Sequence, residues 1–219
     1  MRWSLTDDHL ALRDGIRHAL GKADDGRAVL EDAADLDLED IDKALLAEEA
    51  GRACVGGPVV ETLAGDDVDR RSYVAAGYLV GLAEGMVGMA VEHAGLREQF
   101  GRPVGAFQAV RHPLADVATA VAHARPSVLA AAWSVGAGRP DAALRCSSAK
   151  ILAAQAAESA ARVSLQTHGA MGYTTEHRLH RWLEKTWAMS RAFGDITWHR
   201  RRIGEAILKS ARHTQGERP

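Results

Sequence analysis

Three segments of the sequence combine polar side chains that can bind a ligand with residues that shape the backbone. The first is Arg97-Glu98-Gln99-Phe100-Gly101-Arg102-Pro103, followed by Phe107-Gln108. A guanidinium offers a planar fork of donors to a phosphate, and the amide of Gln108 can donate and accept nearby. Arg97 is also expected in the last turn of a long helix, where the helix dipole alone favours a cation. The segment therefore predicts either an anion site or an ordinary helix end.

The other two segments contain glycines. Gln166-Thr167-His168-Gly169-Ala170-Met171-Gly172-Tyr173-Thr174 is either a helix end with its turn, or a site whose glycines let backbone amides approach a phosphate or a flat ring. In Phe193-Gly194-Asp195, the aspartate is well placed to cap the helix that follows.

Metal-binding and disulfide patterns are weak. His177 and His180 are three residues apart without a third ligand nearby, so polar surface side chains are the simpler interpretation. Cys54 and Cys146 show neither CxxC nor Cys/His spacing, which makes them small core residues rather than a disulfide or zinc framework. We predict no metal site.

The elements that position these residues are expected to be helices, giving an all-α fold. The chain has 219 residues and 5% aromatic side chains, and no segment alternates as a half-buried strand does. Thr6 caps a first helix that ends near Gly21. A polar connection, a helix over 36–52 and a short helix from Pro58 to Leu63 follow.

An acidic linker, residues 65–69, divides a shortened N-terminal helical region (1–65) from a C-terminal up-down bundle domain (70–213). Its helices are expected at the ranges 70–99, 106–135, 141–166, 177–192 and 196–212. Pro113 and Pro126 should kink or shorten the second of these.

Four glycines fall on one face of the helix over 70–99, at positions 77, 81, 85 and 88. Each costs about 1 kcal/mol relative to alanine in a helix interior. We therefore expect a neighbouring helix or backbone to approach this face closely.

The charge balance excludes some classes of partner. Twenty-seven Lys and Arg against 29 Asp and Glu give a net charge of −2. No global positive field favours nucleic acid or a membrane surface, and the basic run 198–202 is expected to be a solvated helix face. No run approaches 18 uninterrupted apolar residues, and Asp7 and Asp8 stand where a signal peptide would be apolar. We expect a cytoplasmic protein.

A family resemblance becomes specific at three longer segments: LREQFGRPVGAFQAVRHPLADV, SSAKILAAQAAESAARV and QTHGAMGYTTEH. Across residues 71–212 they resemble, in order and spacing, the C-terminal helical domain of acyl-CoA dehydrogenases. Leu5–Leu20 and LAEEAGRACVGGPVVETL are similar to pieces of that family's N-terminal helical domain. The resemblance implies a four-helix bundle, tightly bound FAD, and oligomers in which one subunit's bundle holds the adenine and diphosphate of its neighbour's FAD.

The resemblance also implies roles for particular residues. Arg97 and Phe100 match the Arg-x-x-Phe that meets the FAD diphosphate, Gln108 matches the glutamine at the start of the next helix, and Gln166, Gly169 and Gly172 match the loop near the adenine. Ala170 replaces the second glycine of that loop.

Two departures from the family pattern affect catalysis. The glutamate that removes the α-proton aligns with Phe193, or in some members with Arg71, and neither side chain is a base at neutral pH. Glu84 is three to four turns too far along its helix, and Asp195 is a weak candidate because capping explains it. The family's β-domain would fall near residues 64–70, which are too few to form it.

These features predict a degenerate subunit of a heteromeric acyl-CoA dehydrogenase, inactive alone. It would share FAD with a full-length partner that supplies the β-domain, the base and most of the pocket for an acyl-CoA, plausibly a bulky one. The alternative is a non-catalytic helical scaffold derived from that family. A third hypothesis, a non-redox enzyme, would depend on Asp195, His168 and Glu176.

Overall fold

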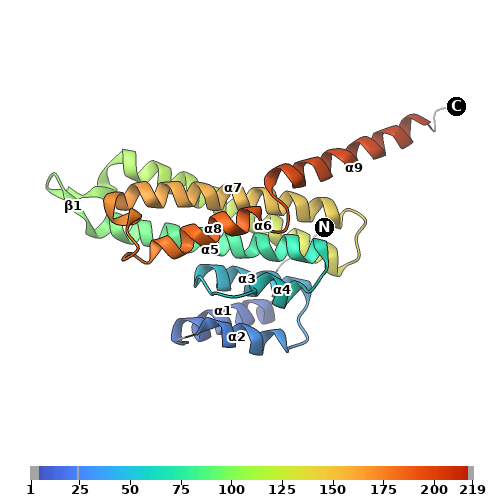
Figure 1. The fold of residues 1–219 in the computed structure, drawn as a ribbon, viewed down its shortest axis with the longest axis horizontal. Coiled ribbons are helices and arrows are strands. Elements are labelled where there is room, and N and C mark those ends of the chain that lie inside the picture. Colours follow the sequence, from blue (N-terminus) through green and yellow to red (C-terminus); the bar gives the residue numbers. More distant parts are fainter. Residues whose placement is uncertain (1–4, 24, 217–219) are drawn as a thin grey trace.

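The computed structural model describes residues 5–23 and 25–216, with side chains up to Lys209. Helices dominate, as the composition predicts, and they form successive layers (Figure 1). The first layer holds α1 (Asp7–Lys22) and α2 (Gly26–Ala34), and the next layer holds α3 (Asp40–Arg52) and α4 (Val59–Ala64). The bundle consists of α5 (Val68–Leu96), α6 (Gln108–Gly136), α7 (Ala142–His168) and α8 (Leu179–Arg191). The last helix, α9 (Ile196–Gly216), extends away from the bundle.

The only strands in the described chain are two-residue segments, β1 (Glu98–Gln99) and β2 (Arg102–Pro103), which pair as an antiparallel hairpin after α5. Two short 3-10 helices complete the fold: η1 (Val104–Ala106) before α6 and η2 (Gly169–Tyr173) between α7 and α8. The all-α prediction is confirmed.

The N-terminal helices begin at clear capping residues. Thr6 caps α1 as expected, its hydroxyl accepting from the His9 backbone N–H at 3.3 Å. The prediction of a polar connection after α1 is wrong, because Asp25 caps a further helix there, α2. This helix buries Leu30 and Ala33 on one face, and that small apolar face is enough to fold it onto the core.

The glycine face of α5 meets α3 at close range. A Cβ at Gly81 would overlap the carbonyl oxygen of Glu48, and one at Gly77 would lie 2.9 Å from that of Ala44. At Gly85 a Cβ would lie 2.5 Å from the indole nitrogen of Trp182. The predicted close approach is confirmed at these three glycines and is wrong at Gly88, which has nothing within 4 Å.

Buried ion pairs join the layers. Glu49 is fully buried and accepts from Arg17 of α1 at 2.6 Å and from Arg52 at 2.8 Å. Burial alone would raise the pKa of Glu49, but the two guanidinium hydrogen bonds outweigh it and hold that pKa below its usual value. Arg125 of α6 likewise binds Glu48 of α3 at 2.7 Å, so the N-terminal helices and the bundle share one polar framework.

The two longest helices of the bundle differ from expectation in one respect each. α6 continues through both Pro113 and Pro126, so of the two effects predicted for these prolines, a kink or a shortening, the shortening does not occur. Among the described helices α5 alone is long and apolar enough to cross a membrane, but 72% of its most apolar stretch is buried inside the bundle. It is the central helix of the core, and its apolar character follows from contact with neighbours on every side.

The turn between α8 and α9 is held by one buried lysine. Phe193 and Gly194 both adopt positive φ, 58° and 93°. The Lys150 ammonium is 1% exposed and donates to the carbonyl oxygens of Met189 at 3.0 Å, Ser190 at 3.3 Å and Gly194 at 3.1 Å. These acceptors lie on both sides of Phe193, so a single cation fixes the turn.

Candidate functional site

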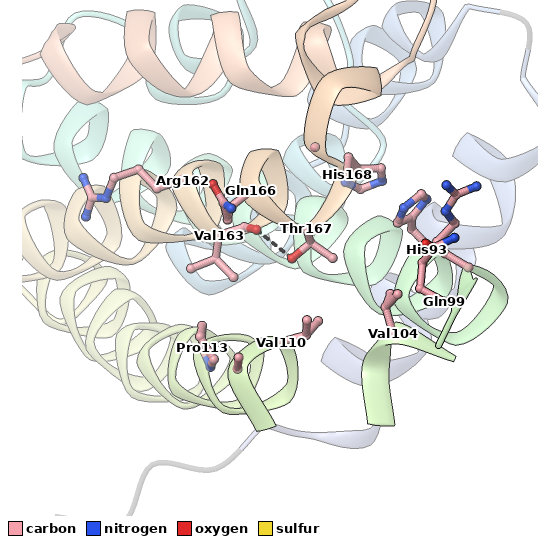
Figure 2. A pocket seen from close by; sticks show the side chains of 13 residues that line it. His93, Gln99, Val104, Val110, Pro113, Arg162, Val163, Gln166, Thr167 and His168 are labelled. Atoms are coloured by element: carbon pink, nitrogen blue, oxygen red, sulfur yellow. Dashed lines mark hydrogen bonds between the residues drawn. The ribbon is translucent and has the colours of Figure 1, made fainter. Parts of the chain in front are cut away.

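A cavity of about 730 Å³ opens at one end of the bundle, where the ends of α5 and α7 meet the start of α6. His93 and Arg97 come from α5, and Arg162, Gln166 and His168 from α7. Figure 2 shows His93 beside His168 at one end of the cavity, with Val110 and Pro113 of α6 opposite the α7 side chains. The site therefore has an apolar floor and a polar wall of nitrogen donors.

The charge of this cavity is positive. Two arginines and two histidines line it, and no aspartate or glutamate does. Neither Arg97 nor Arg162 forms an ion pair with any residue that the structure describes. Because an arginine without a carboxylate partner retains its capacity for bidentate hydrogen bonding, the cavity can accept an anion such as a phosphate or diphosphate.

Three histidine rings, His93, His168 and His177, lie in a column at the edge of the cavity, each tilted against the next. The ring centroids of His93 and His168 lie 4.6 Å apart, and those of His168 and His177 lie 4.7 Å apart. Burial first, and then the charge of His168, lowers the pKa values of both His93 and His177. The charge of Arg97 acts on His93 in the same direction. At neutral pH these groups favour the neutral imidazole.

The structure brings together three of the six cofactor-binding residues proposed from sequence. Arg97, Gln166 and Gly169 all line the cavity. Gly169 has a φ of 61°, which lets the chain turn sharply at the end of α7.

The other three lie outside the cavity lining. Phe100 is 91% exposed at the hairpin tip, with a φ of 53°, and its ring stands edge-on to that of Phe107 at 6.0 Å. Gln108 is exposed at the first residue of α6. Gly172 is buried, and a Cβ there would lie 3.0 Å from the Leu165 side chain. Their proposed roles stay predictions.

Sequence reasoning missed two of the cavity's nitrogen donors, His93 and Arg162. Each lies four residues before a predicted site residue: His93 before Arg97, and Arg162 before Gln166. Residues four apart share a face of a helix, so this spacing was the signal that could have found them.

Arg71 and Phe193, the two positions where the resemblance to the family places the base, lie close together. The guanidinium carbon of Arg71 lies 6.0 Å from the centroid of the Phe193 ring. Arg71 also donates to the carbonyl oxygen of Gly65 and pairs with Asp66. Neither of these two side chains is a base at neutral pH.

Two of the other acids considered from the sequence, Glu84 and Asp195, have structural partners. Glu84 binds Arg125 at 3.1 Å, and Asp195 accepts the Trp198 backbone N–H at 2.7 Å, which is N-cap geometry. Among the residues that the structure describes, no group of three or more His, Cys, Asp or Glu side chains could hold a metal ion.

The described chain is an all-α bundle with an arginine-lined cavity at one end, and no carboxylate lines that cavity. Residues 69–208 match the family "Acyl-CoA dehydrogenase, C-terminal domain". This match covers more than half of the chain, and the protein belongs to the acyl-CoA dehydrogenase family, whose members are flavoproteins.

Individual relatives agree with this assignment. The probable acyl-CoA dehydrogenase YngJ of Bacillus subtilis is 34% identical over 134 residues, which are 61% of this chain and 35% of YngJ. The butyryl-CoA dehydrogenase of Megasphaera elsdenii has a TM-score of 0.62 at 26% identity, covering 68% of this chain and 38% of that one. A variant of the Tcur3481-Tcur3483 steroid ACAD has a TM-score of 0.63 at 27% identity, and the match covers 70% of this chain and 41% of that one. The chain thus spans well under half the length of these relatives.

Proposed function

We propose that this chain is a non-catalytic subunit of a heteromeric FAD-dependent acyl-CoA dehydrogenase, an enzyme that desaturates an acyl-CoA. It supplies the cavity around Arg97 to the diphosphate and adenine end of an FAD shared with a partner subunit. The partner, a full-length relative, supplies the β-domain and the catalytic base.

The observation that carries this proposal is the contrast between two parts of one bundle. At one end the cavity presents Arg97 and Arg162 with no opposing carboxylate among its lining residues. Near the other end of α5, both base positions are filled by Arg71 and Phe193, which contact each other. The chain has kept the groups that bind an anion and lacks the group that removes a proton.

The cavity suits the proposed cofactor. Guanidinium forks on α5 and α7 face a shared space of about 730 Å³, and the apolar side chains of Val110 and Pro113 offer a surface to a flat ring. When bound, FAD supplies the hydride acceptor of the family's reaction. The residues of this chain would hold its phosphates and neutralise their charge.

The need for a partner follows from the middle of the chain. α4 ends at Ala64 and α5 begins at Val68, so residues 65–67 alone join them. No domain can be built from three residues, and the chain has nothing at this point to cover a flavin ring or an acyl-CoA. The paired name of the Tcur3481-Tcur3483 steroid ACAD fits an assembly of unlike chains and a bulky substrate.

The test is co-expression with full-length acyl-CoA dehydrogenases encoded by neighbouring genes, followed by flavin absorbance of the purified complex. We expect stoichiometric FAD in the mixed complex. Arg97→Ala should weaken FAD binding about 10- to 100-fold, because a charge-assisted hydrogen bond to phosphate contributes about 1.5–3 kcal/mol. Arg191→Ala, an exposed arginine of α8 that does not line the cavity, is the matched control.

Two results would contradict the proposal. Turnover of an acyl-CoA by the isolated chain with an electron acceptor would show that it needs no partner base. A stable complex without flavin, in every pairing that forms, would instead favour the scaffold alternative, which the loss of both base positions also supports.

A further inference from the structure

The histidine column adds to the cavity's wall of nitrogen donors. His93 and His168 both line the cavity, and His177, just before α8, contacts His168 from the other side. His168 is 5% exposed, whereas His93 and His177 are half-buried. The buried ring of His168 therefore joins the two outer rings of the column.

The hydrogen bonds of the column leave room for an added proton. Nδ1 of His168 lies 2.8 Å from the carbonyl oxygen of Ser164, so this nitrogen carries the hydrogen and donates. Nδ1 of His177 accepts the backbone N–H of Leu179 at 3.2 Å, so the hydrogen of neutral His177 is on Nε2. A second proton on His168 can go only to Nε2, the nitrogen with no protein partner among the described residues.

The charged groups that line the cavity oppose a proton on the column while the cavity holds no ligand, and the nearby carboxylates, Glu92 and Glu176, lie outside the cavity lining. Arg97 lies one turn beyond His93 on α5, and Arg162 lines the same cavity from α7. Arg178, next to His177, is 3.6 Å from Glu92 of α5, which partly offsets its charge. No carboxylate lines the cavity itself. An entering anion would be the first negative charge to face the histidines from that side.

We propose that the column of His93, His168 and His177 takes up a proton when a diphosphate group enters the cavity, so that the ligand binds more tightly as the pH falls. The inference rests on the proposed role of the cavity in holding a diphosphate. It adds a second recognition element, the histidines, and makes retention of the ligand dependent on pH.

The sign follows from linkage. A neighbouring anion stabilises an imidazolium, which raises the pKa of His93 from its lowered value in the ligand-free site. The bound form then holds more protons than the free form near neutral pH, and binding must strengthen on acidification. Uptake of one full proton corresponds to a tenfold change in affinity per pH unit, and partial uptake to proportionately less.

The experiment is isothermal titration calorimetry of the full chain with inorganic pyrophosphate. It is run near pH 6 and pH 8 in buffers of different ionisation enthalpy that contain no phosphate. We expect net proton uptake and at least a threefold tighter dissociation constant at the lower pH. The difference between wild type and His93→Gln removes the ligand's own ionisation, and that variant should lose most of the uptake while still binding through Arg97. His123→Gln, on the exposed side of α6, is the matched control.

Three outcomes would overturn the inference: no pyrophosphate binding, binding without protein-linked proton uptake, or equal uptake in His93→Gln and wild type. Circular dichroism of each variant establishes that it is folded. The result is separable from that of the co-expression test. If pyrophosphate binds with proton uptake but no flavin complex forms, the histidine column is supported while the proposed FAD-sharing function fails. If a flavin complex forms but pyrophosphate binds without proton uptake, the proposed function is supported and the inference about the histidine column fails.

Discussion

Replacing His199 by glutamine should make this protein markedly more resistant to acid. His199 lies in the first turn of α9 and has no exposed surface. Its Nε2 donates to the carbonyl oxygen of Phe193 at 3.2 Å, and its Nδ1 has no partner among the described residues. Glutamine can keep the donor to Phe193 and cannot be protonated.

The magnitude follows from the lowered pKa. Burial, and then the nearby charge of Lys150, lowers the pKa of His199 from 6.5 to about 4. The depressed value means that the unfolded chain binds the proton first. Stability is therefore complete above about pH 6.5 and is lost as the pH falls, by about 2 kcal/mol at pH 5 and about 3 kcal/mol below pH 4.

The assay is urea denaturation followed by far-UV circular dichroism near pH 7.5 and pH 5. Between these values wild type should lose about 2 kcal/mol more unfolding free energy than His199→Gln, and the control His123→Gln should behave as wild type. Equal pH dependence in His199→Gln and wild type would refute the argument, because it would mean that His199 titrates alike in the folded and unfolded states.

Three further predictions concern the helix contacts and the turn after α8. Gly81→Ala should lower the free energy of unfolding by about 3 kcal/mol, because the new methyl group overlaps the Glu48 carbonyl oxygen. Gly88→Ala should raise it by up to about 1 kcal/mol, because a Cβ at that position would meet open space. Denaturant midpoints that rank the two variants in the opposite order would contradict the packing. Lys150→Met should lower stability by about 3 kcal/mol by leaving three carbonyls without their donor, and an unchanged melting temperature would show that the ammonium is dispensable. Asp195→Ala should lower the free energy of unfolding by about 1 kcal/mol through loss of the helix cap, and Asp195→Ser should restore that stability. Both variants should leave turnover of the mixed complex unchanged. Loss of turnover in the serine variant would assign Asp195 a catalytic role.

The sequence correctly predicted the parts of the fold that depend on the conformational preferences of residues close together in the chain. The cost of glycine in a helix correctly indicated the contact of α5 with α3 at Gly77, Gly81 and Gly85. At Gly88 the same reasoning failed, since an exposed glycine can remain without a packing reason. α2 was missed because it is only nine residues long and begins with a glycine, and it gains its burial from packing against α1, α3 and α4, which its local pattern does not reveal.

The candidate site was foretold in part. Arg97 and Gln166 stand in motifs that resemble a known family, and both line the cavity. His93 and Arg162 carry no motif, and only the packing of α5 alongside α7, with both C-terminal ends at the cavity, shows that they face the same space. Phe100 is a different case: its motif is present, but the residue is exposed at the hairpin tip and its role stays a prediction. Such a residue can act only on a ligand or subunit outside this chain.

The hydrogen bonds of Lys150 to the turn after α8 affect where the far end of α9 lies. α9 has 21 residues and is therefore about 30 Å long, and its far half projects beyond the other helices (Figure 1). A rotation of about 10° at the turn would move the far end by about 5 Å, more than the thickness of a side-chain contact. The hydrogen bonds of Lys150 therefore help to set the direction of α9, together with the ion pair that Arg202 of α9 forms with Asp69 of α5 at 2.6 Å. Any surface that the far half of α9 contacts in an assembly is positioned in part by these contacts.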